Sequence, residues 1–454
     1  MKKIKREWPF YAFYDHTGMA RHLERMAAKG WMLDHITTNG AWRYHAIEPA
    51  RVHFAVTYFP YASDFDAAPD DDLQEFLDLC EAAGWELVTR TFQLLVFCNR
   101  AEDPVPLDTD PAIQVRNIHE SMWSSYMWGK VIGLGLGCFL LLKALNDFYN
   151  SPFSFLSQYI SLLLLGLGAV LALHEGLELA AYYLWHRRAT RVAEEEGRFL
   201  PTPSRWWREA LYGALFAALL LAYAILGSWR ISLACSLFAL AVELCRRVSY
   251  LLRDALKRFR LPRHFNRIVT FIALWAMILG AQYVRNSSMD LVIGSSHATA
   301  EYTYQDRTYT AYCDDLPLTV GDLLGADDAR YSNRLYSQGT FLASKLSGSQ
   351  ILRNGYDREE NQPKSFYYHV YWSRLDNALD DAAQWRTYYN LYFFDTLDPK
   401  DSHAIDPTPY GAAAAWKNNS SYLLRYEDCV IQLSFGWYPT DAQLSQCIAV
   451  LRSL

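Results

Sequence analysis

Three ionisable residues inside an apolar stretch are the strongest candidates for chemistry in this sequence. His174, Glu175 and Glu178 follow the uncharged run 159–173, and the apolar run Leu179–Trp185 comes directly after them. In a helix, His174 and Glu178 share one face, where they could bind a cation or share a proton. The segment HEGLE lacks the second histidine of the zinc-protease motif HExxH, which argues against a metalloprotease.

Three interpretations of this polar cluster remain open from the sequence. In the first, the helix leaves the membrane before the cluster, which then lies in the cytosol. In the second, the cluster forms a buried structural pair with Glu243 or with an arginine. In the third, the cluster lines a path for protons or ions. Tyr182, Tyr183 and Trp185 resemble an interfacial aromatic belt. If that belt marks the membrane surface, the cluster lies inside the membrane, where ionisable groups are costly and often functional.

The elements that must position the cluster are long apolar segments in the middle of the chain. A helix needs about 20 apolar residues to cross a bilayer core of about 30 Å, which indicates a transmembrane helical domain over residues 116–285. The turn at Gly227–Arg230 decides whether the third and fourth segments are separate spans, and the fourth segment is short. The five predicted spans are 126–146, 157–184, 209–228, 230–245 and 267–285.

The loops between these spans predict the orientation of the protein. The loops after spans two and four are rich in arginine, whereas those after spans one and three contain one arginine between them. Because basic loops stay inside, the N-terminus is predicted to be cytoplasmic, and five spans then place residues 286–454 outside. The basic N-terminus is followed by no apolar run, so no signal peptide is expected. If spans three and four were one broken element, the C-terminal domain would lie inside.

Charge is distributed unevenly along the 454 residues. Residues 1–125 contain 12 Lys and Arg against 19 Asp and Glu, residues 126–284 contain 17 against 9, and residues 285–454 contain 14 against 21. Two acidic globular parts therefore flank a basic membrane block. This distribution argues against nucleic-acid binding, which needs a positive face.

Two further features of the membrane block point to packing and docking. Gly133 and Gly137 form a GxxxG spacing that lets helices approach closely in lipid. The segment Arg246–Arg267 alternates basic and apolar residues, which is typical of a juxtamembrane helix that contacts anionic lipid. The same segment is hypothesised to be a docking surface for the acidic N-terminal domain.

The N-terminal part, residues 1–115, is predicted to be a cytoplasmic domain built from two similar halves. Each half has a helix that ends at a glycine, Gly30 or Gly84, and a strand that begins at Trp31 or Trp85. This repetition predicts a layer of helices on one antiparallel sheet, a ferredoxin-like α+β fold.

The sequence also resembles a known family over residues 8–110. The segments FYAFYDHTGMARHLERMAAKGWML, VHFAVTYFP and LDLCEAAGWELV, followed by about five spans, resemble the bacterial family of unknown function DUF2812, found mainly in Firmicutes. The resemblance implies a membrane protein often encoded beside a PadR-like transcriptional regulator, which would be a cytoplasmic partner. It implies no catalytic residues.

The C-terminal part, residues 286–454, is predicted to be an extracytoplasmic α+β domain. Thr440 is expected to cap a final helix. Cys313, Cys429 and Cys447 are expected to be packed free thiols, with one disulfide as the alternative. The predicted strands are Tyr302–Tyr304, Thr308–Tyr312, Ser365–Trp372, Trp385–Phe394, Ser421–Tyr426 and Cys429–Gly436.

No sequence pattern supports a catalytic, cofactor or metal site, so we expect the protein not to be an enzyme. A folded domain on each side of the membrane favours a sensor or regulatory adaptor in the cell membrane. The alternatives are a transporter or intramembrane enzyme component that uses the polar cluster, and a structural membrane scaffold. The sequence leaves the oligomeric state open.

Overall fold

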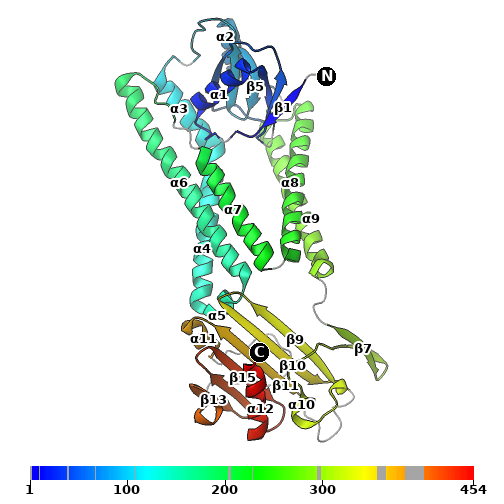
Figure 1. Ribbon diagram of the computed structural model, residues 1–454. Coiled ribbons are helices and arrows are strands. Elements are labelled where there is room, and N and C mark those ends of the chain that lie inside the picture. The colour runs from blue at the N-terminus through cyan, green and yellow to red at the C-terminus, as the bar shows by residue number, and fades with distance from the viewer. Residues whose placement is uncertain are drawn as a thin grey trace. The chain divides into compact units, whose positions relative to one another are not determined.

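The structure is a computed structural model that describes residues 3–9, 11–37, 40–66, 68–107, 109–202, 206–227, 229–293, 298–354, 365–383 and 403–454 (Figure 1). Contacts between Cα atoms divide the chain into two compact units. Unit 1 comprises Met1–Phe139, Leu167–Leu219 and Leu233–Ser288. Unit 2 comprises Leu140–Gly166, Leu220–Ser232 and Met289–Leu454.

The N-terminal part of unit 1 has two helices whose starts are fixed by aspartates. The Asp15 carboxylate accepts a hydrogen bond from the Gly18 N–H at 3.1 Å, and the Asp70 carboxylate accepts one from the Leu73 N–H at 3.0 Å. The elements are β1 (Ile4–Glu7), α1 (His16–Ala28), β2 (Trp31–Ile36), β3 (Trp42–Ala46), β4 (His53–Tyr58), α2 (Asp71–Ala82), β5 (Glu86–Thr91) and β6 (Leu94–Asn99).

The predicted repetition of a helix, a glycine and a strand is present in the structure, although the second strand begins at Glu86 and not at Trp85. Gly30 and Gly84, which follow α1 and α2, both have left-handed backbone angles, with φ of +82° and +83°. The expected single sheet is replaced by two antiparallel three-stranded sheets, ordered β1-β3-β2 and β4-β6-β5. Strands β2 and β5 approach each other but do not pair as a ladder in the described residues. The domain is thus α+β, with its strands divided between two sheets.

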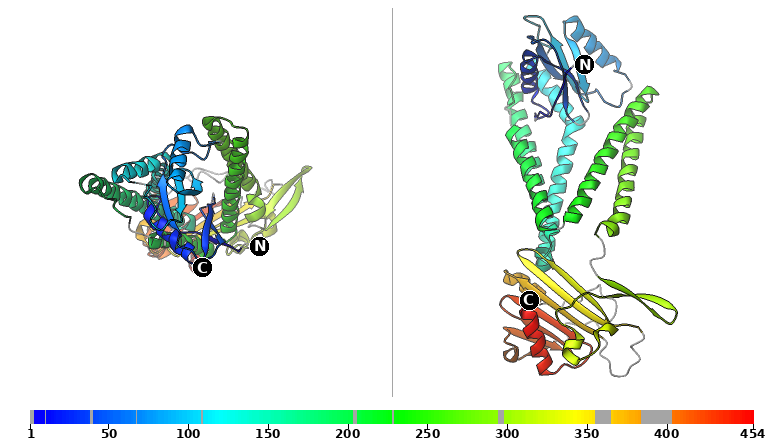
Figure 2. Two further views of the ribbon diagram at one scale, coloured as in Figure 1. Left: turned by 90° about the horizontal axis from the view of Figure 1, so that it is seen from above. Right: turned by 45° about the vertical axis from the view of Figure 1, so that its right-hand side comes forward.

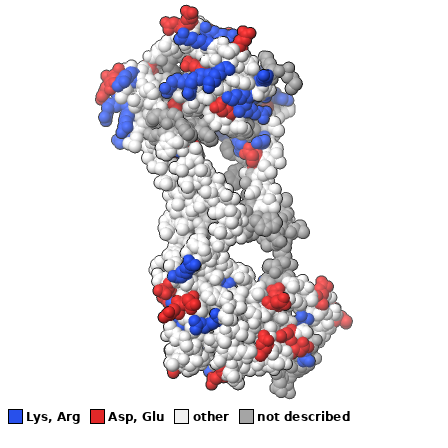
Figure 3. Space-filling view, in the orientation of Figure 1, with Lys and Arg blue, Asp and Glu red and all other residues white. Residues whose placement is uncertain are grey.

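The middle of the chain is helical. Four of its helices, α4, α6, α7 and α9, are long and apolar enough to cross a membrane. Their leucines are largely exposed, as at Leu142 (66%) and Leu279 (63%), and on the face shown in Figure 3 the helical surface is almost free of charged side chains. These surfaces suit contact with lipid. The elements are α3 (Pro111–Ser121), the π-helical turn η1 (Met122–Tyr126), α4 (Met127–Asn150), α5 (Pro152–Leu156), α6 (Tyr159–Glu196), α7 (Trp206–Leu226), α8 (Trp229–Arg258) and α9 (Arg263–Ile293).

Four of the five predicted spans, namely 126–146, 157–184, 209–228 and 267–285, coincide with these four apolar helices. The remaining predicted span, 230–245, is the first half of α8, which continues through the basic segment to Arg258. Several side chains between residues 229 and 239 lie outside the described residues. The structure therefore supports a multi-pass membrane protein with four candidate spans.

Unit 2 is built on a seven-stranded antiparallel sheet with the order β12-β13-β14-β15-β11-β10-β9. One face packs against α10 and α12, and the other packs against α5 and α11 (Figure 2). The elements are β7 (Thr299–Tyr304), β8 (Arg307–Tyr312), α10 (Val320–Leu324), η2 (Asp328–Arg330), β9 (Tyr331–Gly339), β10 (Ala343–Leu352), β11 (Ser365–Ser373), α11 (Asp376–Ala382), β12 (His403–Ile405), η4 (Thr408–Tyr410), β13 (Ala414–Asn418), β14 (Ser421–Arg425), β15 (Cys429–Phe435) and α12 (Asp441–Arg452).

Most strands predicted in the C-terminal part are present. The hairpin β7–β8, strand β11 and the pair β14–β15 are confirmed, and Thr440 caps α12 in a capping box with Gln443. The predicted strand Trp385–Phe394 lies outside the described residues. Cys313, Cys429 and Cys447 are free thiols. The long hairpin β9–β10 was not predicted from the sequence.

Candidate functional site

The polar cluster of His174, Glu175 and Glu178 lies in unit 1, where α6 meets α4 and α7. Glu175 pairs with Lys130 of α4 at 3.1 Å, and Glu178 pairs with Arg208 of α7 at 3.1 Å. The exposed fractions of these four charged side chains lie between 13% and 15%. Glu175 and Glu178 therefore each have a largely buried cation from a neighbouring helix, which offsets the cost of their burial.

His174 lies between two carboxylates. Its Nδ1 is 3.3 Å from Glu175 Oε1, and its Nε2 is 3.4 Å from Glu209 Oε1 of α7. Its ring stacks on Tyr212, with the centroids 3.9 Å apart. When His174 carries a proton on both nitrogens, the cluster holds three positive and three negative charges, because Lys130 and Arg208 supply the other two cations.

Small residues allow α4 and α6 to approach at the cluster. A Cβ added at Gly137 would lie 2.6 Å from the backbone N of Ala172, so only glycine fits there without a shift. A Cβ at Gly133 would lie 3.1 Å from Cγ of Glu175. The two glycines therefore bring the α4 backbone against α6 where the carboxylates emerge, as close packing in lipid requires.

A small polar cavity adjoins the cluster inside unit 1. Its volume is about 140 Å³, which is room for a few water molecules. Lys130, Glu178 and Glu209 line it from the helices, and Tyr11 and Tyr14 line it from the N-terminal domain. The cluster thus lies directly beside the segment that joins β1 to α1.

That segment attaches the N-terminal domain to α6 through aromatic packing. The Tyr14 ring lies 5.2 Å from Tyr182 and 5.0 Å from Trp185, and the Thr202 hydroxyl donates to the Tyr14 carbonyl at 3.3 Å. These rings belong to one buried hydrophobic cluster that includes residues of α1, β4, α3 and α6. The aromatic belt predicted from the sequence therefore contacts protein at Tyr182 and Trp185.

Histidines lie at the same interface. His16 is buried, its Nε2 is 3.1 Å from the Gln114 amide nitrogen of α3, and burial lowers the pKa of His16 to about 4. His119 of α3 stacks on His186 at 4.1 Å and contacts the Tyr182 hydroxyl at 2.7 Å. Burial also lowers the pKa of His119. Neutral imidazoles therefore suit this interface, since a charged ring would lose its hydration.

A second attachment joins the loop 61–66 of the N-terminal domain to α8 and α9. Asp64 pairs with Arg253 at 3.0 Å, and the two side chains are 14% and 6% exposed. Arg263 donates to the Tyr61 carbonyl at 3.1 Å, and the Asn266 amide donates to the Phe65 carbonyl at 3.0 Å. The basic segment Arg246–Arg267 thus contacts the acidic domain, as hypothesised from the charges.

The structure gives the polar cluster partners that the sequence did not identify. Glu243, a predicted partner, pairs with Arg246 and Arg247 of its own helix instead. An arginine was the other predicted partner, and Arg208 occupies that place without having been named. The partners that were missed are Lys130, Glu209 and Tyr212. Lys130 carried a signal, because it is a charge inside a predicted span.

Comparison with known proteins identifies the N-terminal region. Residues 17–129 match the family model described as "Protein of unknown function (DUF2812)". Over this segment the chain is similar to the DUF2812 family. It extends from α1 to the start of α4, so the DUF2812 region includes the loop 61–66 and the turn η1. The searches of curated proteins and of solved structures found no match.

Proposed function

We propose that this protein is a sensor or regulatory adaptor in which a C-terminal binding domain and the DUF2812 domain communicate through the membrane helices. The observation that carries the proposal is that each domain is anchored to segments continuous with α4 and α6. The contacts within each unit are specific and buried, so movement of these helices would strain both domains.

In unit 1, the N-terminal domain shares one hydrophobic core with the helices α3, α4 and α6. Val115 and Ile118 of α3, Met127 of α4 and Tyr182 of α6 are buried in the same cluster as Leu23 of α1. The loop 61–66 adds the Asp64–Arg253 pair on α8. Because the domain contacts two sets of helices, a change in their spacing would alter its surface.

In unit 2, the C-terminal domain holds α5, the short helix that connects α4 to α6. The Phe153 N–H donates to the Asp381 carboxylate at 3.1 Å, and the Phe153 ring meets Tyr371 edge to face at 5.0 Å. The Thr340 hydroxyl donates to the Leu156 carbonyl at 2.5 Å. A rearrangement of this domain would therefore act on the connection between α4 and α6.

The proposal includes details that rest on sequence patterns. It has five spans, with the first half of α8 as the fourth. The N-terminal α+β domain is cytoplasmic, and the C-terminal domain is extracytoplasmic. The cytoplasmic partner would be a regulatory protein, PadR-like if the family resemblance holds. The role is not catalytic, and the cluster serves to hold α4, α6 and α7 together.

Hydrogen–deuterium exchange of the full chain in lipid nanodiscs tests the coupling. Asp381→Ala removes the acceptor for Phe153, and we expect faster exchange in the N-terminal domain at residues 11–16 and 61–66. The control is Asp306→Asn, an exposed carboxylate in the same domain. Unchanged exchange in α12 shows that the variant domain is folded. A variant in which only α5 and its neighbours exchange faster would contradict the proposal.

Proton or ion transport through the polar cluster is the second candidate, favoured by the burial of five ionisable groups among three helices. Transport would require His174 to gain and lose a proton during turnover. Proteoliposomes with a pH gradient test it. Proton flux that His174→Gln abolishes would establish transport, whereas the structural role predicts no flux and a loss of thermal stability in Glu178→Gln.

A further inference from the structure

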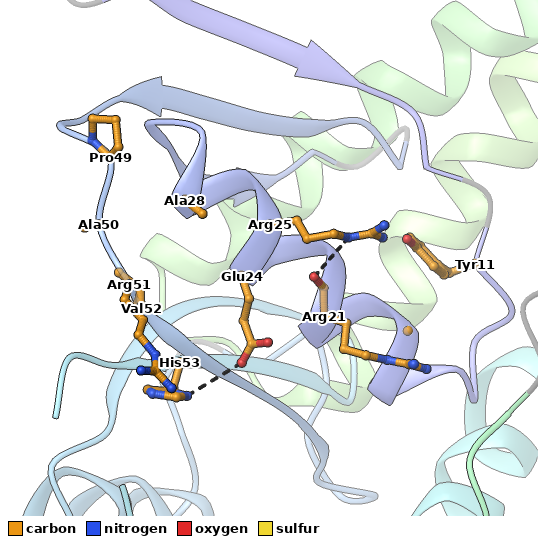
Figure 4. A pocket seen from close by; sticks show the side chains of 11 residues that line it. Tyr11, Arg21, Glu24, Arg25, Ala28, Pro49, Ala50, Arg51, Val52 and His53 are labelled. Carbon is orange, nitrogen blue, oxygen red and sulfur yellow. Dashed lines mark hydrogen bonds and ion pairs between the residues drawn. The ribbon is translucent and has the colours of Figure 1, made fainter. Parts of the chain in front are cut away.

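A basic groove lies on the surface of the N-terminal domain. It has a volume of about 1010 Å³ and lies between α1 and the segment 49–53 that leads into β4 (Figure 4). Arg21 and Arg25 line it from the helix, and Arg51 and His53 line it from the segment. Four basic side chains therefore face one concave surface from two elements.

Local geometry explains why the helix arginines present their charge to the groove. Arg21 and Arg25 are four residues apart and so lie on one face of α1. The Arg21 Nε donates to the Thr17 carbonyl at 3.2 Å, and the Arg25 Nε donates to the Arg21 carbonyl at 3.3 Å. Each guanidinium is thus held at its Nε, and both arginine side chains are exposed.

The lining of the groove has more basic than acidic side chains. Among the described residues, none of Arg21, Arg25 and Arg51 lies within ion-pair distance of a carboxylate. Glu24, the one acid that lines the groove, is 3.8 Å from His53 and accepts a hydrogen bond from the Phe54 N–H. This excess is opposite in sign to residues 1–125 as a whole, which carry a net charge of −7.

We propose that this groove binds an anion that carries two or more phosphate groups. A guanidinium presents paired N–H donors that match the oxygens of a phosphate, and three arginines line a concave space the size of a small-molecule site. An acidic protein segment would be better matched by a flat or extended basic stripe. The observations therefore favour a compact polyphosphate ligand.

The groove is connected to the polar cluster by Tyr11. This residue lines the groove, and it also lines the 140 Å³ cavity beside Lys130 and Glu178. Its ring stacks on Trp42 at 6.1 Å, and in Figure 4 the Arg25 guanidinium points toward it. An anion that draws Arg25 into the groove would change the surroundings of Tyr11. This site is independent of the proposed sensor role, since binding does not depend on topology.

Isothermal titration of the full chain with inorganic pyrophosphate, in phosphatidylcholine nanodiscs, tests the site. We expect saturable binding that weakens at least about tenfold in Arg21→Gln, Arg25→Gln and Arg51→Gln. The control is Arg100→Gln, an exposed arginine of the same domain outside the groove, which should bind as the wild type does.

Two results would overturn the proposal. One is that the folded chain does not bind pyrophosphate. If polyglutamate, a model of an acidic protein segment, binds instead and its binding weakens in the three groove variants, the ligand is an acidic protein segment and the proposal is wrong. The other is binding that the three groove variants leave unchanged. If pyrophosphate binds, the titration is repeated in nanodiscs that contain phosphatidylglycerol to identify the source of the phosphate. Lipid headgroups that occupy the groove would weaken pyrophosphate binding. If the groove takes a soluble ligand, the affinity for pyrophosphate should be the same in both kinds of nanodisc.

Discussion

The buried pair of Asp64 and Arg253 gives the sharpest prediction for the attachment of the DUF2812 domain. Asp64→Asn removes the charge but keeps an oxygen that can accept from the Phe92 N–H, which Asp64 binds at 3.0 Å. Arg253 keeps a second carboxylate, Asp254, at 3.0 Å. The cost should therefore lie below the 3–5 kcal/mol typical of breaking a buried pair, at about 2 kcal/mol.

A cost of about 2 kcal/mol corresponds to a roughly 30-fold increase in the open population of the loop 61–66. Hydrogen–deuterium exchange of that loop in the full chain measures this population. Arg253→Gln should act on the same loop, and the double variant should cost less than the sum of the two. The matched control is Arg258→Gln, which removes an exposed arginine of α8. Exchange in Asp64→Asn within twofold of the wild type would refute the reasoning.

Three other predictions concern single positions. Burial holds the pKa of His16 at about 4, below the value of about 6.5 in the unfolded chain, so the unfolded state binds more protons between these values. The free energy of unfolding should therefore be highest above pH 6.5 and should fall as the pH falls toward 4, by roughly 2 kcal/mol at pH 5. Melting curves measured over this pH range test this, and His16→Gln should remove the dependence. Gly137→Ala should lower the melting temperature through a cost of about 1–3 kcal/mol, because its Cβ meets the α6 backbone. Gly135→Ala, where a Cβ meets nothing within 4 Å, should have no such cost, and equal melting temperatures would contradict the packing. Gly348→Ala should destabilise the C-terminal domain by about 2–4 kcal/mol, because a Cβ would overlap the Tyr368 ring. Hydrogen–deuterium exchange of β10 measures this, and an exchange rate equal to that of the wild type would contradict the prediction.

Local signals made much of the fold predictable. Asp70 before α2 and Thr440 before α12 are helix caps that act within one turn, and Gly84 ends α2 because only glycine readily adopts its positive φ. The apolar helices were predictable because a bilayer requires long uncharged segments. In each case, the residues that decide the structure are close together in the sequence.

Features that depend on distant residues were not predictable. Strands β9 and β10 contain serine, glycine and glutamine in place of an apolar alternation, and they form because β11 pairs with β10. The division of the N-terminal strands into two sheets likewise depends on which strands meet. For the cluster, the sequence identified the α6 residues, but Lys130 and Arg208 reach it from other helices.

The most direct test of the central claim is the accessibility of the two domains in intact cells. Single cysteines at Leu79 of α2 and at Tyr438, which are 68% and 80% exposed, would be introduced after replacement of the native cysteines. A membrane-impermeant maleimide should label Tyr438→Cys in intact cells and Leu79→Cys only after lysis. If both sites react only after lysis, the two domains share one compartment and the account of signalling across the membrane is wrong.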